Sequence, residues 1–194
     1  MVRVCQTELV EGAVAGKVVS FPTDTVPALA VKPEFAESIY HFKQRPTNKP
    51  LILMGASIEE LLTYTVYTPA ELSIWQKLIE QHLPGALTLV LPASDKVTSA
   101  INPTDSNSVG IRIPNHSLAL EIFQQTGVLA TSSANISGQE TLVDGNSIDE
   151  VFPDVLVLEE SGFLQNQMTS GLPSTVICWQ NDTWKVLRQG SVRI

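Results

Sequence analysis

The sequence has few of the residues on which several common classes of small protein depend. Its two cysteines, Cys5 and Cys178, lie far apart and outside any C-x-x-C pattern, which excludes a disulfide framework and a cysteine zinc site. Only 12 Lys and Arg residues stand against 20 Asp and Glu, giving a net charge of −8. A protein whose whole surface binds nucleic acid is therefore excluded, and a reducing compartment is expected.

Long apolar runs are also missing. No stretch reaches the roughly 18 residues that suggest a membrane span, and Glu8 and Glu11 interrupt the region where a signal peptide would be apolar. Hydrophobic residues nevertheless make up 43% of the 194 residues and charged residues 16%, which argues against disorder. We expect a soluble, cytoplasmic protein with no membrane partner and a single domain over residues 1–194.

Familiar catalytic motifs are absent as well. The chain has no G-x-x-x-x-G-K-[ST] loop, no G-x-G-x-x-G, no H-E-x-x-H and no G-x-S-x-G. Its three histidines are scattered, and each is expected to pack or face solvent. Asp24 alone is a weak candidate for a general base. The remaining candidates are cations and hydroxyls, which suit the positioning of phosphates better than covalent catalysis.

What the chain does contain is a local cluster of positive charge. Lys43, Arg45 and Lys49 fall within seven residues, with no acidic residue between them. A helical pattern precedes them, Pro46 cannot continue that helix, and an apolar strand follows at residues 51–54. The cluster therefore occupies a turn between a helix and a core strand, where binding residues are often carried. The alternative is that these cations only answer the helix dipole.

Polar turns follow two predicted strands. Residues 23–25 (Thr-Asp-Thr) follow the strand 17–21, and residues 132–138 (Ser-Ser-Ala-Asn-Ile-Ser-Gly) follow the strand 128–131. Ligands of open α/β sheets bind beyond strand ends, and small side chains let backbone N–H groups approach a phosphate. Either segment could equally be an ordinary polar turn. Arg112, flanked by isoleucines in the strand 108–114, could face solvent or bind a carboxylate in a cleft.

Predicted strands and helices alternate along the chain. Helices are expected at 7–15, 35–42 and 117–126, after the capping boxes at 57 and 68, and after a cap at Ser147. Strands are expected at 17–21, 51–54, 86–91, 108–114, 128–131 and 155–158, with 174–177 paired to 184–188. This order predicts an α/β fold, a single-domain twisted sheet of mixed parallel and antiparallel strands with helices packed on it.

Seven segments, taken in order, resemble the motifs of the YrdC/Sua5/YciO family. They are residues 21–25 (Phe-Pro-Thr-Asp-Thr), 43–46 (Lys-Gln-Arg-Pro), 84–88 (Pro-Gly-Ala-Leu-Thr), 109–114 (Val-Gly-Ile-Arg-Ile-Pro), 133–138 (Ser-Ala-Asn-Ile-Ser-Gly), 174–176 (Ser-Thr-Val) and 187–190 (Leu-Arg-Gln-Gly). One such motif is weak, but seven in the right order are specific. The resemblance implies a YrdC-like fold around a positively charged cleft, without the C-terminal domain of the longer Sua5 type.

The resemblance also implies an activity, that of a short-form L-threonylcarbamoyl-AMP synthase, a nucleotidyltransferase. L-threonine, bicarbonate and ATP, with Mg²⁺, would give L-threonylcarbamoyladenylate and pyrophosphate for the t6A modification of tRNA. A threonylcarbamoyl-transferase complex is the implied partner, and tRNA or double-stranded RNA a possible one. The motifs assign catalysis to Lys43, Arg45, Ser133 and Asn135, ATP binding to Arg45, Lys49, Ser108, Ser133, Thr141 and Arg188, and L-threonine binding to Thr25, Arg112, Thr131 and Ser174. They assign no protein ligand to a metal.

The chain departs from the family pattern at two places. Met54 stands where many members carry a histidine, so that a contact with threonine is missing or replaced, and Pro27-Ala28 replaces a usual Tyr-Gly. Two other functions remain open. One is that of a YciO-like paralogue, against which the complete Lys-x-Arg and Ser-x-Asn set counts. The other is binding of double-stranded RNA or tRNA without catalysis, against which the acidic composition and the shortage of stacking aromatics count.

Overall fold

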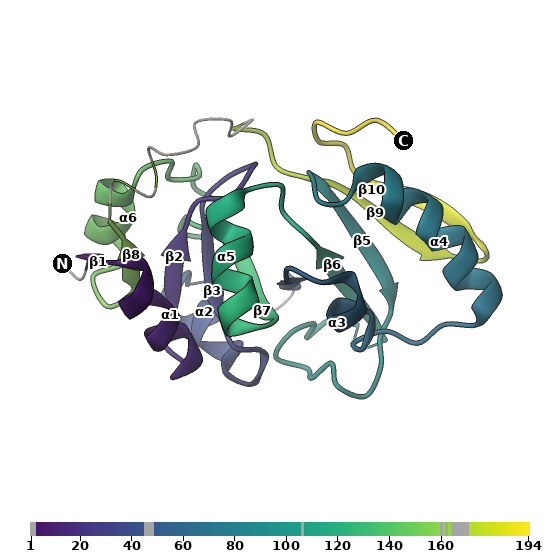
Figure 1. Cartoon of the computed structure of the whole chain (residues 1–194), viewed down its shortest axis with the longest axis horizontal. Coiled ribbons are helices and arrows are strands. Elements are labelled where there is room, and N and C mark those ends of the chain that lie inside the picture. The colour runs from purple at the N-terminus through teal and green to yellow at the C-terminus, as the bar shows by residue number, and fades with distance from the viewer. Residues whose placement is uncertain (1–2, 45–48, 106, 160, 162, 164–170) are drawn as a thin grey trace.

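The computed structural model describes residues 3–44, 49–105, 107–159, 161, 163 and 171–194 (Figure 1). Its strands form one sheet in the order β1-β8-β2-β3-β7-β4-β6-β5-β9-β10, with parallel and antiparallel neighbours. The strands are β1 (Arg3–Val4), β2 (Val19–Phe21), β3 (Ala28–Val31), β4 (Ile52–Met54), β5 (Leu87–Pro92), β6 (Ser108–Arg112), β7 (Leu129–Ser133), β8 (Leu156–Leu158), β9 (Thr175–Gln180) and β10 (Thr183–Arg188). The predicted α/β fold class and mixed sheet are therefore confirmed.

Four of the described helices begin at a residue whose side chain caps the first turn. The described helices are α1 (Gln6–Val14), the 3₁₀ turn η1 (Pro33–Phe35), α2 (Glu37–Phe42), α3 (Ile58–Leu62), α4 (Pro69–His82), α5 (Ser117–Thr126) and α6 (Gly145–Val151). In α4, Thr68 and Glu71 form a capping box, which satisfies two N–H groups that the helix itself leaves free. None of the described helices is long and apolar enough to cross a membrane.

Helices cover the two faces of the sheet unequally. On one face, α2, α3, α4 and α6 pack on a large apolar cluster that includes Leu53, Ile111 and Trp75. On the other face, α1 and α5 pack over the β2, β3 and β7 side of the sheet, around Phe21 and Leu129 (Figure 1). The part of this second face that α1 and α5 leave uncovered carries the cavity described below.

Three elements differ from the sequence prediction. β3, with the sequence Ala-Leu-Ala-Val, was not predicted because its four residues are all buried and show no polar alternation. β1 is only two residues long and was not predicted either. The prediction that Ser147 caps α6 was wrong, because Asp144 is the N-cap, accepting hydrogen bonds from the Ser147 N–H at 2.9 Å and from its hydroxyl at 2.8 Å.

Candidate active site

A cavity of about 580 Å³ lies on the partly uncovered face of the sheet. Its floor is made of alternate residues of neighbouring strands, because side chains two apart in a strand share a face. Met54 is in register with Arg112, and Ile52 with both Gly110 and Thr131. The side chain of Met54 therefore lies beside that of Arg112, and the side chain of Ile52 beside that of Thr131. The walls come from the loop after β2, the loop before β6, the segment before β9 and the end of β10.

Arg112, at the end of β6, lines this cavity and is 2% exposed. Its Nη2 forms an ion pair with Asp24 Oδ1 at 2.5 Å, its Nη1 donates to Thr25 Oγ1 at 2.9 Å, and its Nε donates to the Gly85 carbonyl at 3.0 Å. Burial lowers the pKa of Arg112 from its ordinary value, and the Asp24 carboxylate opposes that shift. The strand arginine therefore lines a cleft and is held in one orientation by three partners.

The Thr-Asp-Thr turn is what places two of these partners. Thr23 Oγ1 donates to the Val26 carbonyl at 2.7 Å and accepts from the Thr25 N–H at 3.2 Å, which is the geometry of a Ser/Thr turn. Both threonines are 1% exposed. The local turn therefore also directs Asp24 and Thr25 toward Arg112.

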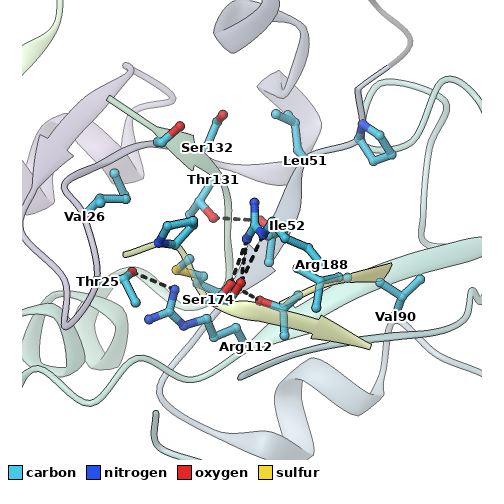
Figure 2. Close-up of a pocket in the computed structure, with 18 of the residues that line it drawn as sticks. Thr25, Val26, Leu51, Ile52, Val90, Arg112, Thr131, Ser132, Ser174 and Arg188 are labelled. Carbon is cyan, nitrogen blue, oxygen red and sulfur yellow. Dashed lines mark hydrogen bonds between the residues drawn. The ribbon is translucent and has the colours of Figure 1, made fainter. Parts of the chain in front are cut away.

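Arg188 lies on the other side of the cavity. Its Nε and Nη2 donate to the Ser174 carbonyl at 3.1 and 2.9 Å, and Nη2 also donates to Ser174 Oγ at 3.1 Å. Ser174 Oγ in turn lies 2.9 Å from Thr88 Oγ1. Figure 2 shows Ser174 between the two arginines, and the positive charge of Arg188 contributes to the lowered pKa of Arg112. Two guanidinium groups thus share one cavity.

Gly190 permits this arrangement. A Cβ atom at this position would lie 2.2 Å from the Pro173 carbonyl oxygen and 2.5 Å from the Thr175 nitrogen, distances that no side chain tolerates. The Gly190 N–H also donates to Thr175 Oγ1 at 2.9 Å. The glycine two residues after Arg188 therefore lets the last segment approach the start of β9 closely enough for Arg188 to reach Ser174.

Lys43 fastens the end of α2 to the segment that follows β7. Its side chain is fully buried, and its Nζ donates to the carbonyl oxygens of Ser133 and Asn135 and to Asn135 Oδ1, the latter two at 2.7 and 3.0 Å. Asn135 Oδ1 also accepts from Ser133 Oγ at 2.6 Å. Lys43, Ser133 and Asn135, which the motifs assign to catalysis, therefore meet, but the ammonium group binds the loop and is not among the groups that line the cavity.

The structure brings together most of the residues singled out in the sequence. Eight of them line the cavity: Thr25, Ser108, Arg112, Thr131, Ser133, Thr141, Ser174 and Arg188. Lys43, Lys49 and Asn135 do not line it, and Lys49 is exposed, so their contact with a ligand stays a prediction. Arg45 lies outside the described residues.

The sequence interpretation gave no binding role to several polar groups of the site, among them Asp24, Thr88 and Asp105. Asp24 was considered only as a general base, Thr88 was not assigned a role, and Asp105 was left in a loop. Asp24 and Thr88 lie inside quoted motifs, which was the available signal, whereas Asp105 carries no local pattern. Among the described residues Asp105 is the one carboxylate that lines the cavity. The described residues also contain no group of three or more His, Cys, Asp or Glu side chains that could bind a metal.

Similar proteins of known sequence cover most of this chain. It is 32% identical to the threonylcarbamoyl-AMP synthase of Bacillus subtilis (strain 168) over 181 residues, which are 91% of this chain and 50% of the relative. It is also 32% identical to that of Vibrio campbellii over 182 residues, 90% of this chain and 93% of the relative. The chain thus spans about half the length of the Bacillus protein and nearly all of the Vibrio protein.

Solved structures share the fold. A crystal structure of P. abyssi Sua5 complexed with L-threonine matches with a TM-score of 0.83 and 30% identity, over 97% of this chain and 55% of that one. The crystal structure of E. coli YciO matches with a TM-score of 0.80 and 25% identity, over 96% of this chain and 89% of that one. The family model Sua5/YciO/YrdC, described as "Telomere recombination", matches residues 13–190. The chain therefore belongs to the Sua5/YciO/YrdC family.

Proposed function

We propose that this protein is a threonylcarbamoyl-AMP synthase, which forms L-threonylcarbamoyladenylate and pyrophosphate from L-threonine, bicarbonate and ATP. The observation that carries the proposal is the pair of guanidinium groups, Arg112 and Arg188, on two sides of one cavity. One suits an amino-acid carboxylate and the other a phosphate. The names of the relatives, and the L-threonine complex of the Pyrococcus structure, support the same substrates.

The amino acid binds at Arg112. Nη1 and Nη2 each carry two hydrogens. Nη1 donates one of its hydrogens to Thr25, and Nη2 donates one of its hydrogens to Asp24. Among the described residues the other hydrogen of each nitrogen has no partner, so one donor on each remains for a carboxylate. Because Asp24, Thr25 and the Gly85 carbonyl already fix the guanidinium plane, the carboxylate binds without ordering a flexible side chain first.

The nucleotide binds along the remainder of the cavity. Arg188 keeps its Nη1 hydrogens for phosphate oxygens, since its contacts with Ser174 use Nε and Nη2. Ser108 lines the cavity from β6, and its Oγ accepts from Asn102 Nδ2 at 3.1 Å, which leaves its hydroxyl hydrogen for the nucleotide. Ser133 lines the cavity from β7, and its hydroxyl hydrogen is donated to Asn135. Lys43 acts by holding the carbonyl groups of the β7 loop, which fixes where Ser133 lies. The cavity of about 580 Å³ is in the range of sites for small organic ligands.

The chemistry needs no nucleophile from the protein. The threonine amine attacks bicarbonate, water leaves, and a carbamate forms. A carbamate oxygen then attacks the α-phosphorus of ATP, and the bond to pyrophosphate breaks as the new P–O bond forms. The task of the protein is to hold two anions in contact and to offset the negative charge that develops, which is the role of fixed cationic donors.

Mg²⁺ accompanies ATP in this proposal. Mg²⁺ is commonly held by one or two carboxylates together with substrate phosphates, and Asp105 supplies one carboxylate to the cavity lining. Asp105 Oδ1 accepts from the Asn107 N–H at 3.1 Å, which leaves Oδ2 for the ion. When bound, Mg²⁺ would neutralise charge on the triphosphate. The product is handed on, in the cytoplasm, to a threonylcarbamoyl-transferase complex that modifies tRNA.

The proposal is tested by measuring pyrophosphate release from ATP with and without L-threonine and bicarbonate. Release that needs both, and that falls by about 10²–10³ in Arg188→Gln, is the expected result. Arg193→Gln, a change of the same kind at an exposed arginine, is the matched control and should act as the parent does. A folded protein without threonine-dependent release, which instead binds double-stranded RNA in a salt-sensitive way, would refute the synthase.

A further inference from the structure

Beside Arg112 the floor of the cavity is a methionine. Met54, the last residue of β4, is in register with Arg112 in the neighbouring parallel strand, so the two side chains stand next to each other on one face of the sheet. Met54 is 6% exposed, lines the cavity and packs into the apolar cluster under α5. Its surface toward a ligand is a thioether chain, which offers apolar contact and no strong hydrogen-bonding group.

The hydroxyl groups near Met54 are engaged within the protein. Thr131 Oγ1 donates to the Ile52 carbonyl at 2.9 Å. Thr25 Oγ1 accepts from Arg112 and lies 3.1 Å from Thr23 Oγ1. Ser174 Oγ is shared with Thr88 and Arg188. All of these buried hydroxyl groups would therefore keep a hydrogen-bond partner when the amino acid bound at Arg112 has no side-chain hydroxyl.

We propose that Met54 is a specificity-determining residue: it makes the amino-acid subsite recognise the methyl group on the β-carbon of the substrate and not the hydroxyl of threonine. The inference rests on the proposed function, with the amino-acid carboxylate at Arg112. A site built to bind a hydroxyl rejects the analogue without it by about 10⁴–10⁵, because its own polar groups lose their partner, whereas an apolar pocket separates such isosteres by about 10² at most. L-valine is therefore a substrate of this protein.

The direct test is the ratio of kcat/KM for L-threonine and L-valine in bicarbonate-dependent pyrophosphate release. In the parent protein the two amino acids should differ by less than about 10², and L-serine, which lacks the methyl group, should fall below L-valine by about 10-fold or more. In Met54→Gln, which has a chain of similar length and a polar amide, the preference for L-threonine over L-valine should rise at least about 10-fold. Met54→Leu is the matched control and should keep the parental ratio.

The outcomes separate the two proposals. If L-threonine supports release and L-valine is slower by more than about 10³, the specificity inference is overturned and the synthase stands. An unchanged ratio in a folded Met54→Gln also overturns the role of Met54. If neither amino acid supports release, the proposed function itself fails and takes the inference with it. Should Met54→Gln not fold, the parental threonine, valine and serine values alone decide the question.

Discussion

Replacing Asp24 by asparagine should destabilise the protein, because Arg112 then stays buried without the negative charge that compensates it. The exposed fractions of the two side chains are 11% for Asp24 and 3% for Arg112, so the ion pair is almost removed from water. Asparagine keeps the shape and one acceptor oxygen but removes the charge. Arg112 then remains as a buried cation whose other partners, a threonine hydroxyl and a backbone carbonyl, are neutral.

The expected loss follows from this burial. Removing one partner of a buried ion pair costs about 3–5 kcal/mol, because the other charge stays buried without compensation. Asparagine still accepts one hydrogen bond from Nη2, so the lower end, about 3 kcal/mol, applies. For a domain of this size that corresponds to a fall in Tm of about 6–12 °C. Urea unfolding followed by tryptophan fluorescence measures the free energy directly, with Asp95→Asn at an exposed position as the control.

A second substitution separates lost charge compensation from a damaged turn. In the double variant Asp24→Asn with Arg112→Met the unpaired cation is gone, and an apolar side chain of similar length replaces it. Such replacements of buried ion pairs are often neutral or stabilising, so the double variant should be more stable than Asp24→Asn alone. A double variant less stable than Asp24→Asn, or an Asp24→Asn protein within about 1 kcal/mol of the parent, would refute the reasoning.

Two further predictions concern Lys43 and His116. Lys43→Met should lower the free energy of unfolding by about 2–4 kcal/mol, because the oxygens of Ser133 and Asn135 lose a charged donor. Lys77→Met at an exposed site of α4 is the control and should change it by less than about 0.5 kcal/mol. Equal effects would contradict the role of Lys43 in holding the segment after β7. His116 Nδ1 accepts from the Ala119 N–H at 3.4 Å and burial lowers its pKa, so stability should be fully present above about pH 6.5 and decline below it. His116→Asn should flatten that dependence in unfolding experiments near pH 5 and pH 8, and an unchanged slope would contradict it.

The fold could be predicted as far as local patterns extend. The capping box at Thr68, the stop at Gly127 and most strand positions follow from short-range chemistry, and the structure has them. β3 could not be found in this way, because a strand buried on both faces has no alternation to detect. Asp144 and not Ser147 is the cap of α6 because the helix begins at Gly145. The exact first residue of a helix is the feature that a local sequence pattern defines least well.

The sequence could predict which residues belong to the site, but it could not predict which of them contact one another. The motifs name eight of the residues that line the cavity. They do not say that Arg112 pairs with Asp24 or that Arg188 binds Ser174, since these partners are 88 and 14 residues apart in the chain. Nor do they say that Lys43 points into the β7 loop. These contacts exist only once the sheet has ordered its strands as β7-β4-β6-β5-β9, and a single sequence carries no measure of that order or register.

The acidic composition of the chain is compatible with the proposed binding of anions in the cavity, because the two charge distributions act over different distances. The net charge of −8 is spread over the surface, where salt screens it within about 8–10 Å. Arg112 and Arg188 instead share one partly enclosed cavity, where low-dielectric walls strengthen their field at the ligand. Asp24 offsets one of these charges and at the same time fixes its orientation. The net charge of the whole molecule therefore disfavours polyanion binding over the surface in general, while the proposed site for a small anion depends on two arginines inside one cavity.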